Sequence, residues 1–520
     1  MTLTLGRGRI LQKVQSKGLT MFQSALKGAS VVAALLVSTA AHAELTADQI
    51  WSNWKTMYGS VLSAGSETRE GDTLILRTVT TTSAFEGGSF TGSIETISLR
   101  EPGDGTVEIT MSPDYKILLR FSDAETGEIV VDAGLRQPDL RMVASGSEAE
   151  IRYDFSMPSA SAVLNSLTVD GKPIEAVFSA DMTAATGNSM FTQGAPRRFA
   201  STIAVDGARM FYSFADPETR AKTEATYNLK DLGVTTSGTI LDAVLMEDVA
   251  QALADGLKFD MSISTGFAES TSSIIGPEGT TEFKATNDSS TGTIGFGQDG
   301  LAFKSAGTGI VYAMSSASAA MPPMQASARE MDIDLRMPIA KSDEPGDFAL
   351  KLNLGDVELS EDVWGLFDPQ KVLPRDPASM VIDTKGKMNW LVNIFDDEQT
   401  AALKPGDSPV ALQALEIPQV LLRAAGAEVT GTGAFTFDNS DTTTFPGMPM
   451  PTGQLDLKIV GTNGLLDRLV QMGVLPEDQA MGARMMMGLF AKTVEGSDDT
   501  LTSTLEFKDK GFFANGQRLQ

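Results

Sequence analysis

Residues 427–437 read AEVTGTGAFTF, and residues 454–460 read QLDLKIV. In the first stretch, threonines alternate with a set of apolar residues and glycines: Val429, Gly431, Gly433, Phe435 and Phe437. In the second stretch, leucine and isoleucine alternate with Asp456 and Lys458. A period of two is typical of a β-strand that turns one face to water and the other to an apolar environment. The two stretches therefore predict strands of a half-buried sheet.

The period changes after this pair of strands. Four apolar residues recur at helical spacing: Leu465, Leu466, Leu469 and Val470. Gly473 follows them and is suited to end a helix, because glycine readily adopts a positive φ. Pro476 is suited to the first position of a second helix, which we expect to reach Lys492. The strand pattern then resumes at Leu501, so a pair of helices is predicted between strands near the C-terminus.

Most of the remaining chain has the strand pattern. From Thr73 onward, short alternating runs such as Leu74–Thr80 and Ser93–Arg100 are separated by turn residues. An earlier helix is expected, because one broad apolar face follows Thr46: Ile50, Trp51, Trp54, Tyr58, Val61 and Leu62. We therefore predict a mainly β fold, in which a large antiparallel twisted sheet or sheets carry a few packed helices. Strand should exceed helix by at least about two to one.

The first 43 residues have the pattern of a secretory signal peptide. Lys27 precedes an uncharged run that ends in Ala41-His42-Ala43, a pattern of small residues suited to cleavage before Glu44. The run is shorter than the roughly 20 residues that a membrane-spanning helix needs. We expect residues 1–43 to be removed and the protein to be periplasmic. Residues 1–20 lengthen the basic head unusually, and Met21 would make an ordinary start. Residues 44–520 are then the β-rich region, with two lobes, 44–330 and 331–520.

Composition limits the chemistry of the chain. The 520 residues include 67 acidic and 41 basic side chains, no cysteine and a single histidine, His42. Without cysteine or histidine after residue 43, there is no disulfide, thiolate nucleophile, Ser-His-Asp triad or usual zinc or copper site. A net charge of −26 disfavours nucleic acid as a partner. We expect no cofactor, no metal and no transmembrane segment in residues 44–520.

The segment Leu359–Trp390 gathers the most distinctive polar residues. Its acids are Asp362, Asp368, Asp376 and Asp383. Carboxylates can act as acid and base catalysts, but caps and turns, with Arg375 paired to an acid, explain them more simply. Asp438–Asp441 and Ser497–Asp499 are oxygen-rich, yet neither has the spacing of an EF-hand loop. We assign no catalytic residue and no metal ligand.

Methionines suggest a different kind of site. The predicted second helix carries more apolar positions than one contact with a sheet requires, and methionine is common on adaptable apolar surfaces. The candidate ligand-binding residues are Met481, Met485, Met486 and Phe490. Filling of a core by the same side chains is the alternative.

Several motifs resemble one family of proteins. They are Trp364-Gly365-Leu366-Phe367-Asp368-Pro369, Leu373-Pro374-Arg375-Asp376-Pro377, Gly431–Phe437, Leu465–Pro476 and Asn515-Gly516. They resemble the exported bacterial family numbered 2125 among domains of unknown function, over nearly all of the chain after residue 43. That family has no established catalytic residues, so the resemblance implies none here. The β-rich pattern is also loosely similar in architecture to AsmA-like envelope proteins, whose sheets handle lipids.

Three functions fit this sequence. The leading hypothesis is non-catalytic binding of a lipid or other apolar ligand, or of an envelope protein. The alternatives are a carboxylate-dependent hydrolase that acts on an envelope glycan and a structural component of the envelope. A hydrolase would bring two acids to about 5–10 Å from each other, a binding protein would present an apolar groove, and a structural component would show neither.

Overall fold

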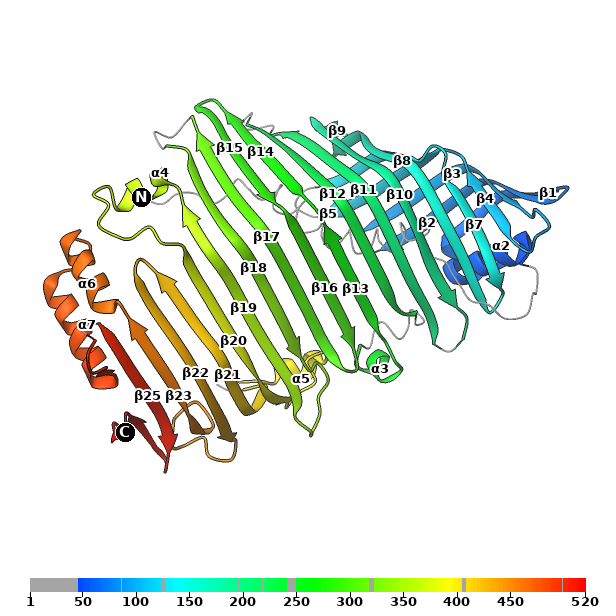
Figure 1. Ribbon diagram of the computed structural model, residues 1–520. Coiled ribbons are helices and arrows are strands. Elements are labelled where there is room, and N and C mark those ends of the chain that lie inside the picture. Colours follow the sequence, from blue (N-terminus) through cyan, green and yellow to red (C-terminus); the bar gives the residue numbers. More distant parts are fainter. Residues whose placement is uncertain are drawn as a thin grey trace. The chain divides into compact units, whose positions relative to one another are not determined.

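The computed structural model describes residues 45–520 except 86, 124–126, 195, 217–218, 220, 241–248, 318–321, 405–407 and 498. The expected signal peptide, residues 1–43, lies outside the described residues. The chain forms two compact units, and Figure 1 labels their helices and strands. Unit 1 contains the described residues up to Ile240 together with Ala268–Glu282, and unit 2 contains Leu241–Phe267 and Phe283–Gln520.

The predicted fold class is confirmed. Strand makes up about 65% of the structure and helix 12%. The strands pair antiparallel in both units. The expected helix near residue 46 and the expected pair near the C-terminus are both present.

Unit 1 is built from antiparallel strands and an α-helix of 12 residues. Its elements are α2 (Ala47–Tyr58), η2 (Gly59–Val61), β1 (Leu62–Glu70), β2 (Thr73–Phe85), β3 (Gly88–Arg100), β4 (Val107–Met111), β5 (Asp114–Asp123), β6 (Gly127–Arg136), β7 (Arg141–Ser147), β8 (Glu150–Val169), β9 (Lys172–Pro173), β10 (Ala176–Thr192), β11 (Arg197–Ala215), β12 (Lys222–Ile240) and β14 (Ala268–Gly276). The two halves of β3 pair with β4 and β5, which lead through β7 and β6 to β8. Strands β10, β11, β12 and β14 extend from β8 in that order.

Helix α2 covers the sheet of unit 1 with its apolar face. The helix begins in a capping box, in which the Thr46 hydroxyl accepts from the backbone N–H of Gln49 and the Gln49 side chain bonds back to the backbone N–H of Thr46. Trp54 Nε1 donates to the hydroxyl of buried Tyr153 at 2.9 Å. The other buried residues of this core include Ile50, Trp51, Leu76, Val79, Ile97, Leu99, Val107, Ile109 and Ile151. Unit 1 therefore has a conventional core between a helix and a sheet.

Unit 2 is an antiparallel meander, and its helices range from 5 residues in α5 to 14 residues in α7. Its elements are α3 (Val249–Ala254), β13 (Phe259–Thr265), β16 (Ser289–Gly297), β17 (Gly300–Ser316), β18 (Met324–Met337), β19 (Gly346–Leu359), α4 (Glu361–Phe367), β20 (Ala378–Trp390), α5 (Asp397–Ala401), β21 (Val410–Ala424), β22 (Ala427–Asp438), β23 (Met450–Val460), α6 (Thr462–Gln471), α7 (Glu477–Phe490), β24 (Lys492–Thr493), β25 (Thr500–Lys508), β26 (Gly511–Ala514) and β27 (Gln517–Arg518). The strands pair in the order β13, β16, β17, β18, β19, β20, β21, β22, β23, β25, β26. Strand β15 (Gly279–Asn287) contains residues of both units.

The C-terminal helices follow the sequence pattern with two differences. The backbone N–H groups of Asn463 and Gly464 donate to the Asp499 carboxylate. This carboxylate therefore satisfies two N–H groups in the first turn of α6 and balances the positive end of its dipole. Gly473, at φ 73°, follows α6 as expected. Pro476 caps α7 from outside the helix instead of opening it. Our placement of Lys492 in α7 is wrong, because the chain becomes extended at Ala491 and Lys492 pairs with β25.

Candidate functional site: an apolar sheet face

The strands of unit 2 separate apolar from polar side chains. Along β19, four apolar residues occupy alternate positions: Phe348, Leu350, Leu352 and Leu354. The residues between them, such as Lys351, point to the opposite face because side chains alternate along a strand. Register places Leu352 beside Ile333 of β18 and Ile382 of β20. The apolar residues that alternate along each strand therefore lie side by side and form one apolar face across the sheet.

This apolar face continues over ten strands. One cross-strand row of partners contains Ile263, Gly292, Ser305, Ile333, Leu352, Ile382, Val420, Gly431, Leu457 and Ser503. We define the apolar face by this row and its apolar neighbours on the same side: Met261, Ile294, Phe296, Leu301, Phe303, Met331, Leu335, Met337, Phe348, Leu350, Leu354, Met380, Met388, Leu415, Ile417, Leu422, Val429, Phe435, Leu455, Ile459, Leu501 and Leu505.

The apolar face is largely uncovered. Among the large apolar side chains that define the face, Met388 and Leu501 are fully buried and the others are partly or well exposed. Ile263 is 39% exposed, Met331 45% and Leu422 52%. Large apolar patches of this kind are uncommon on monomeric proteins and mark sites of interaction.

Glycines allow the bulky side chains of the face to lie close to the sheet. A Cβ atom at Gly386 would stand 2.7 Å from Cε1 of Phe348, and one at Gly431 would stand 2.6 Å from Cδ2 of Leu457. Both distances are too short for real carbon contacts, so the neighbouring ring and isobutyl group occupy the space that glycine leaves free. A side chain at either position would force these neighbours away from the sheet.

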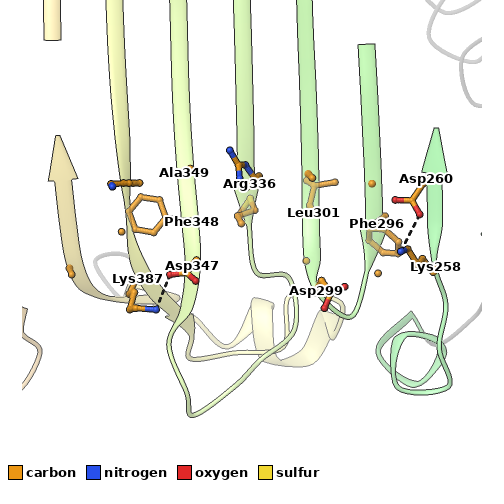
Figure 2. Close-up of a pocket in the computed structure, with 18 of the residues that line it drawn as sticks. Lys258, Asp260, Phe296, Asp299, Leu301, Arg336, Asp347, Phe348, Ala349 and Lys387 are labelled. Carbon is orange, nitrogen blue, oxygen red and sulfur yellow. Dashed lines mark hydrogen bonds and ion pairs between the residues drawn. The ribbon is translucent and has the colours of Figure 1, made fainter. Parts of the chain in front are cut away.

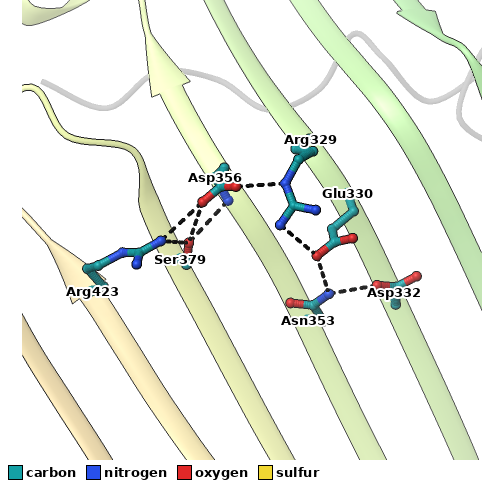
Figure 3. Close-up of polar contacts among 7 residues, drawn as sticks. All are labelled: Arg329, Glu330, Asp332, Asn353, Asp356, Ser379 and Arg423. Carbon is teal, nitrogen blue, oxygen red and sulfur yellow. Dashed lines mark hydrogen bonds and ion pairs between the residues drawn. The ribbon is translucent and has the colours of Figure 1, made fainter.

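The opposite face of the same strands is polar and hydrogen-bonded (Figure 3). Arg329 Nε donates to the Asp356 carboxylate at 2.7 Å, and Arg423 Nη2 and Ser379 Oγ donate to the same group at 3.1 and 3.2 Å. The hydrogen bond from Arg329 lowers the pKa of Asp356, and burial opposes it only in part. Beside them, Asn353 Nδ2 donates to Asp332 at 2.7 Å. On the polar face, these charged side chains are therefore paired with one another.

A hollow of about 760 Å³ lies on the polar face near one end of the strands (Figure 2). Small residues of adjacent strands line it: Gly295, Ala302, Ala349 and Ala414. Three of its four acids face lysines: Asp347 lies 2.8 Å from Lys387, Glu416 3.0 Å from Lys385 and Asp260 3.4 Å from Lys258. A two-carboxylate hydrolase needs two acids directed at one substrate bond. The geometry of this hollow gives that chemistry no support.

Asp368, one of the acids considered for catalysis, holds a loop together. Its buried carboxylate accepts from the backbone N–H groups of Val372 and Leu373, each at 2.9 Å, and from Arg375 Nη1 at 2.6 Å. The Arg375 guanidinium lies 4.2 Å from the centre of the Trp364 ring. Burial favours a raised pKa for Asp368, but these hydrogen bonds outweigh burial and lower it.

The other three acids of that segment occupy different environments. Asp362 and Asp376 are exposed, and Asp383 is half-buried on the polar side of β20. Asp368 is thus the acid whose contacts match the interpretation of caps and turns.

The candidate methionines lie on the surface of α7. Met481, Met485 and Met486 are exposed, and Met485 reaches 73%, whereas Ala480 is the buried residue of the helix. Phe490 is half-buried, and its carbonyl accepts from Ser503 Oγ on the apolar face at 2.6 Å. The three methionines therefore do not fill a core. Whether they bind a ligand stays a prediction.

The apolar face itself was missed as a site by the sequence analysis. The available signal was the alternation in strand after strand between residues 259 and 507, together with too few helices to cover them. The described part of the chain brings no three histidine, cysteine, aspartate or glutamate side chains into an arrangement that could hold a metal. Within the same residues, no helix combines the length and apolarity needed to cross a bilayer.

The protein is thus defined by an antiparallel sheet on which the described residues leave most of one apolar face uncovered. Residues 262–516 match the family described as uncharacterized protein conserved in bacteria (DUF2125). The match confirms the resemblance read from the sequence, although it begins at residue 262. No curated protein and no solved structure gives a match.

Proposed function

We propose that the protein is a non-catalytic lipid-binding protein and that the acyl chains of its ligand lie on the apolar face of unit 2. The observation that carries the proposal is the exposure of Ile263, Met331 and Leu422 within a face that is continuous over ten strands. Covering apolar surface contributes roughly 25 cal/mol per Å², so an apolar ligand gains free energy from most of this face.

The scarcity of polar groups on the face favours an acyl chain over a protein partner. Protein interfaces carry about one hydrogen bond per 100–200 Å². Strand pairing already uses the backbone N–H and C=O groups. The defining row offers the hydroxyl of Ser305, whereas the buried hydroxyl of Ser503 already donates to the Phe490 carbonyl. An occupant without hydrogen-bonding groups along its length fits such a surface.

The strands are long enough for this ligand. Strand β19 has 14 residues, which corresponds to about 45 Å at about 3.3 Å per residue. An acyl chain that spans half of a bilayer core of about 30 Å needs about 15 Å. Whole chains therefore fit along the strand direction, and the width of ten strands leaves room for more than one.

Two neighbouring positions on β19 allow a matched test. In the double variant Leu350→Gln and Leu352→Gln, the apolar face gains two amides, whereas Lys351→Gln changes the polar face of the same strand. We would titrate the purified protein with cis-parinaric acid, a fluorescent fatty acid, and measure Kd. We expect the double variant to weaken binding by about tenfold or more, since each buried amide lacks a partner, and the Lys351 variant to bind as the parent does.

Circular dichroism and thermal melting would check that both variants fold. A folded double variant with the Kd of the parent would refute binding on this face. Absence of probe binding by the parent, with a concentration-dependent dimer in its place, would assign the face to a second copy of the chain.

We also propose that the protein acts after export to the periplasm. The support is the uncharged run that ends in Ala41-His42-Ala43. The mass of protein from the envelope fraction should correspond to a chain that starts at Glu44. Recovery of residues 1–43 on the purified protein would overturn this proposal and would leave the binding proposal unaffected.

A further inference from the structure

One end of the apolar face is closed by a small buried cluster. Helix α3 and the segments that follow β18 and β20 meet there, and Figure 1 shows α3 and α5 at the same end of the strands. The cluster consists of Ala252, Leu253, Leu257 and Ile339, and Phe296 and Leu301 of the apolar face pack against it. Apolar groups at this end of the face are therefore already shielded from water.

The face becomes more exposed toward the other end of the same strands. On β18, Met337 adjoins the cluster residue Ile339 and is half-buried, whereas Met331 is 45% exposed. On β13, Phe259 is half-buried next to the closed end, whereas Ile263 is exposed. Leu422, on the row that contains Met331, is exposed as well. On β13 and β18, exposure thus increases along the strands in one direction, whereas Leu501 of β25, at the far side of the same row, is buried.

We infer that the face binds an amphipathic lipid in one orientation, with the methyl end of the acyl chain at the closed end and the polar head group at the open end. The inference rests on the proposed function. Its physical reason is that a head group keeps its hydration only where water reaches it. The methyl end of the chain gains most free energy where the surrounding apolar groups are already shielded from water. The same asymmetry makes the open end the place of entry.

The absence of cysteine from the chain provides a direct test. Met337→Cys and Met331→Cys each introduce a single thiol on the same face of β18, about 20 Å from each other at about 3.3 Å per residue. After a fluorophore is attached to the thiol, the labelled protein is titrated with two nitroxide fatty acids. One carries the nitroxide near its carboxylate and the other near its methyl end.

We expect crossed quenching. The methyl-end nitroxide should quench the label at Met337→Cys several-fold more than the label at Met331→Cys, and the carboxylate-end nitroxide should show the reverse. A label at Lys351→Cys, on the polar face, should be quenched weakly by both. Quenching that is reversed, or equal at the two positions, would overturn the orientation while binding persists.

Binding of each fatty acid to the unlabelled parent is measured by calorimetry alongside. This measurement separates the two proposals, because its failure would refute the proposed function itself. Melting of each labelled variant confirms that it is folded. If a variant at position 337 fails to fold, Leu301→Cys, which is its cross-strand partner, replaces it.

Discussion

The sheet under α2 in unit 1 and the apolar face of unit 2 share one sequence pattern and have different surroundings. Leu99 lies between the polar residues Ser98 and Arg100, and both Leu99 and Leu76 are completely buried in the core that α2 covers. Leu350 and Leu352 alternate in the same way, yet both keep partial exposure. The difference lies in the rest of the chain, since residues 47–58 supply a covering helix to unit 1 and the described residues supply none of comparable size over β19. Alternation therefore specifies a two-faced strand, and the covering element decides whether its apolar face becomes core or surface.

The largest expected effect sets a core leucine against a face leucine. Leu76→Ala removes a completely buried side chain and should cost about 2–5 kcal/mol of unfolding free energy. Leu352→Ala leaves a partly exposed position and should cost about 1 kcal/mol or less. Urea unfolding of the two variants, monitored with signals that report on each unit, measures both changes in unfolding free energy. Equal losses would mean that the face is covered as completely as the core.

A second prediction concerns the loop that Asp368 and Arg375 hold in unit 2. Because the folded-state pKa of Asp368 is lowered, its carboxylate stabilises the fold above the unfolded pKa of about 3.9, and this contribution disappears as pH falls through the lowered value. Asp368→Asn should therefore lower Tm clearly at neutral pH, and the difference from the parent should shrink below about pH 4. A difference that is constant from neutral to acidic pH would show that the charge of Asp368 is unimportant.

The fold could be predicted from the sequence, whereas the candidate site could be predicted only in part. The antiparallel β class, the helix at Ala47–Tyr58 and the C-terminal pair of helices follow from local periodicity, which is a property of neighbouring residues. The apolar face depends on the register that aligns ten strands with one another and on the absence of a cover among the described residues, and periodicity within one strand contains neither. The stripe on α7 was recognised by its width, but whether such a stripe is buried is decided by tertiary packing.

The smallest expected effect concerns the surface of α7. Met485→Gln changes a side chain that is 73% exposed and should alter the unfolding free energy by no more than about 0.5 kcal/mol. Thermal melting at low protein concentration measures the change. A loss of several kcal/mol would place Met485 in a buried contact and would weaken the contrast between covered and uncovered apolar surfaces.

Methionine oxidation tests the central claim most directly, because three methionines report on three environments in one sample. Met142 lies in the core of unit 1, Met331 on the apolar face and Met485 on α7. With dilute peroxide and peptide mass spectrometry, we expect rapid oxidation of Met331 and Met485 and slow oxidation of Met142 in lipid-free protein. Addition of a fatty acid should protect Met331 and leave the other two rates unchanged. Oxidation of Met331 as slow as that of Met142 without lipid, or as fast with bound lipid as without it, would contradict the account.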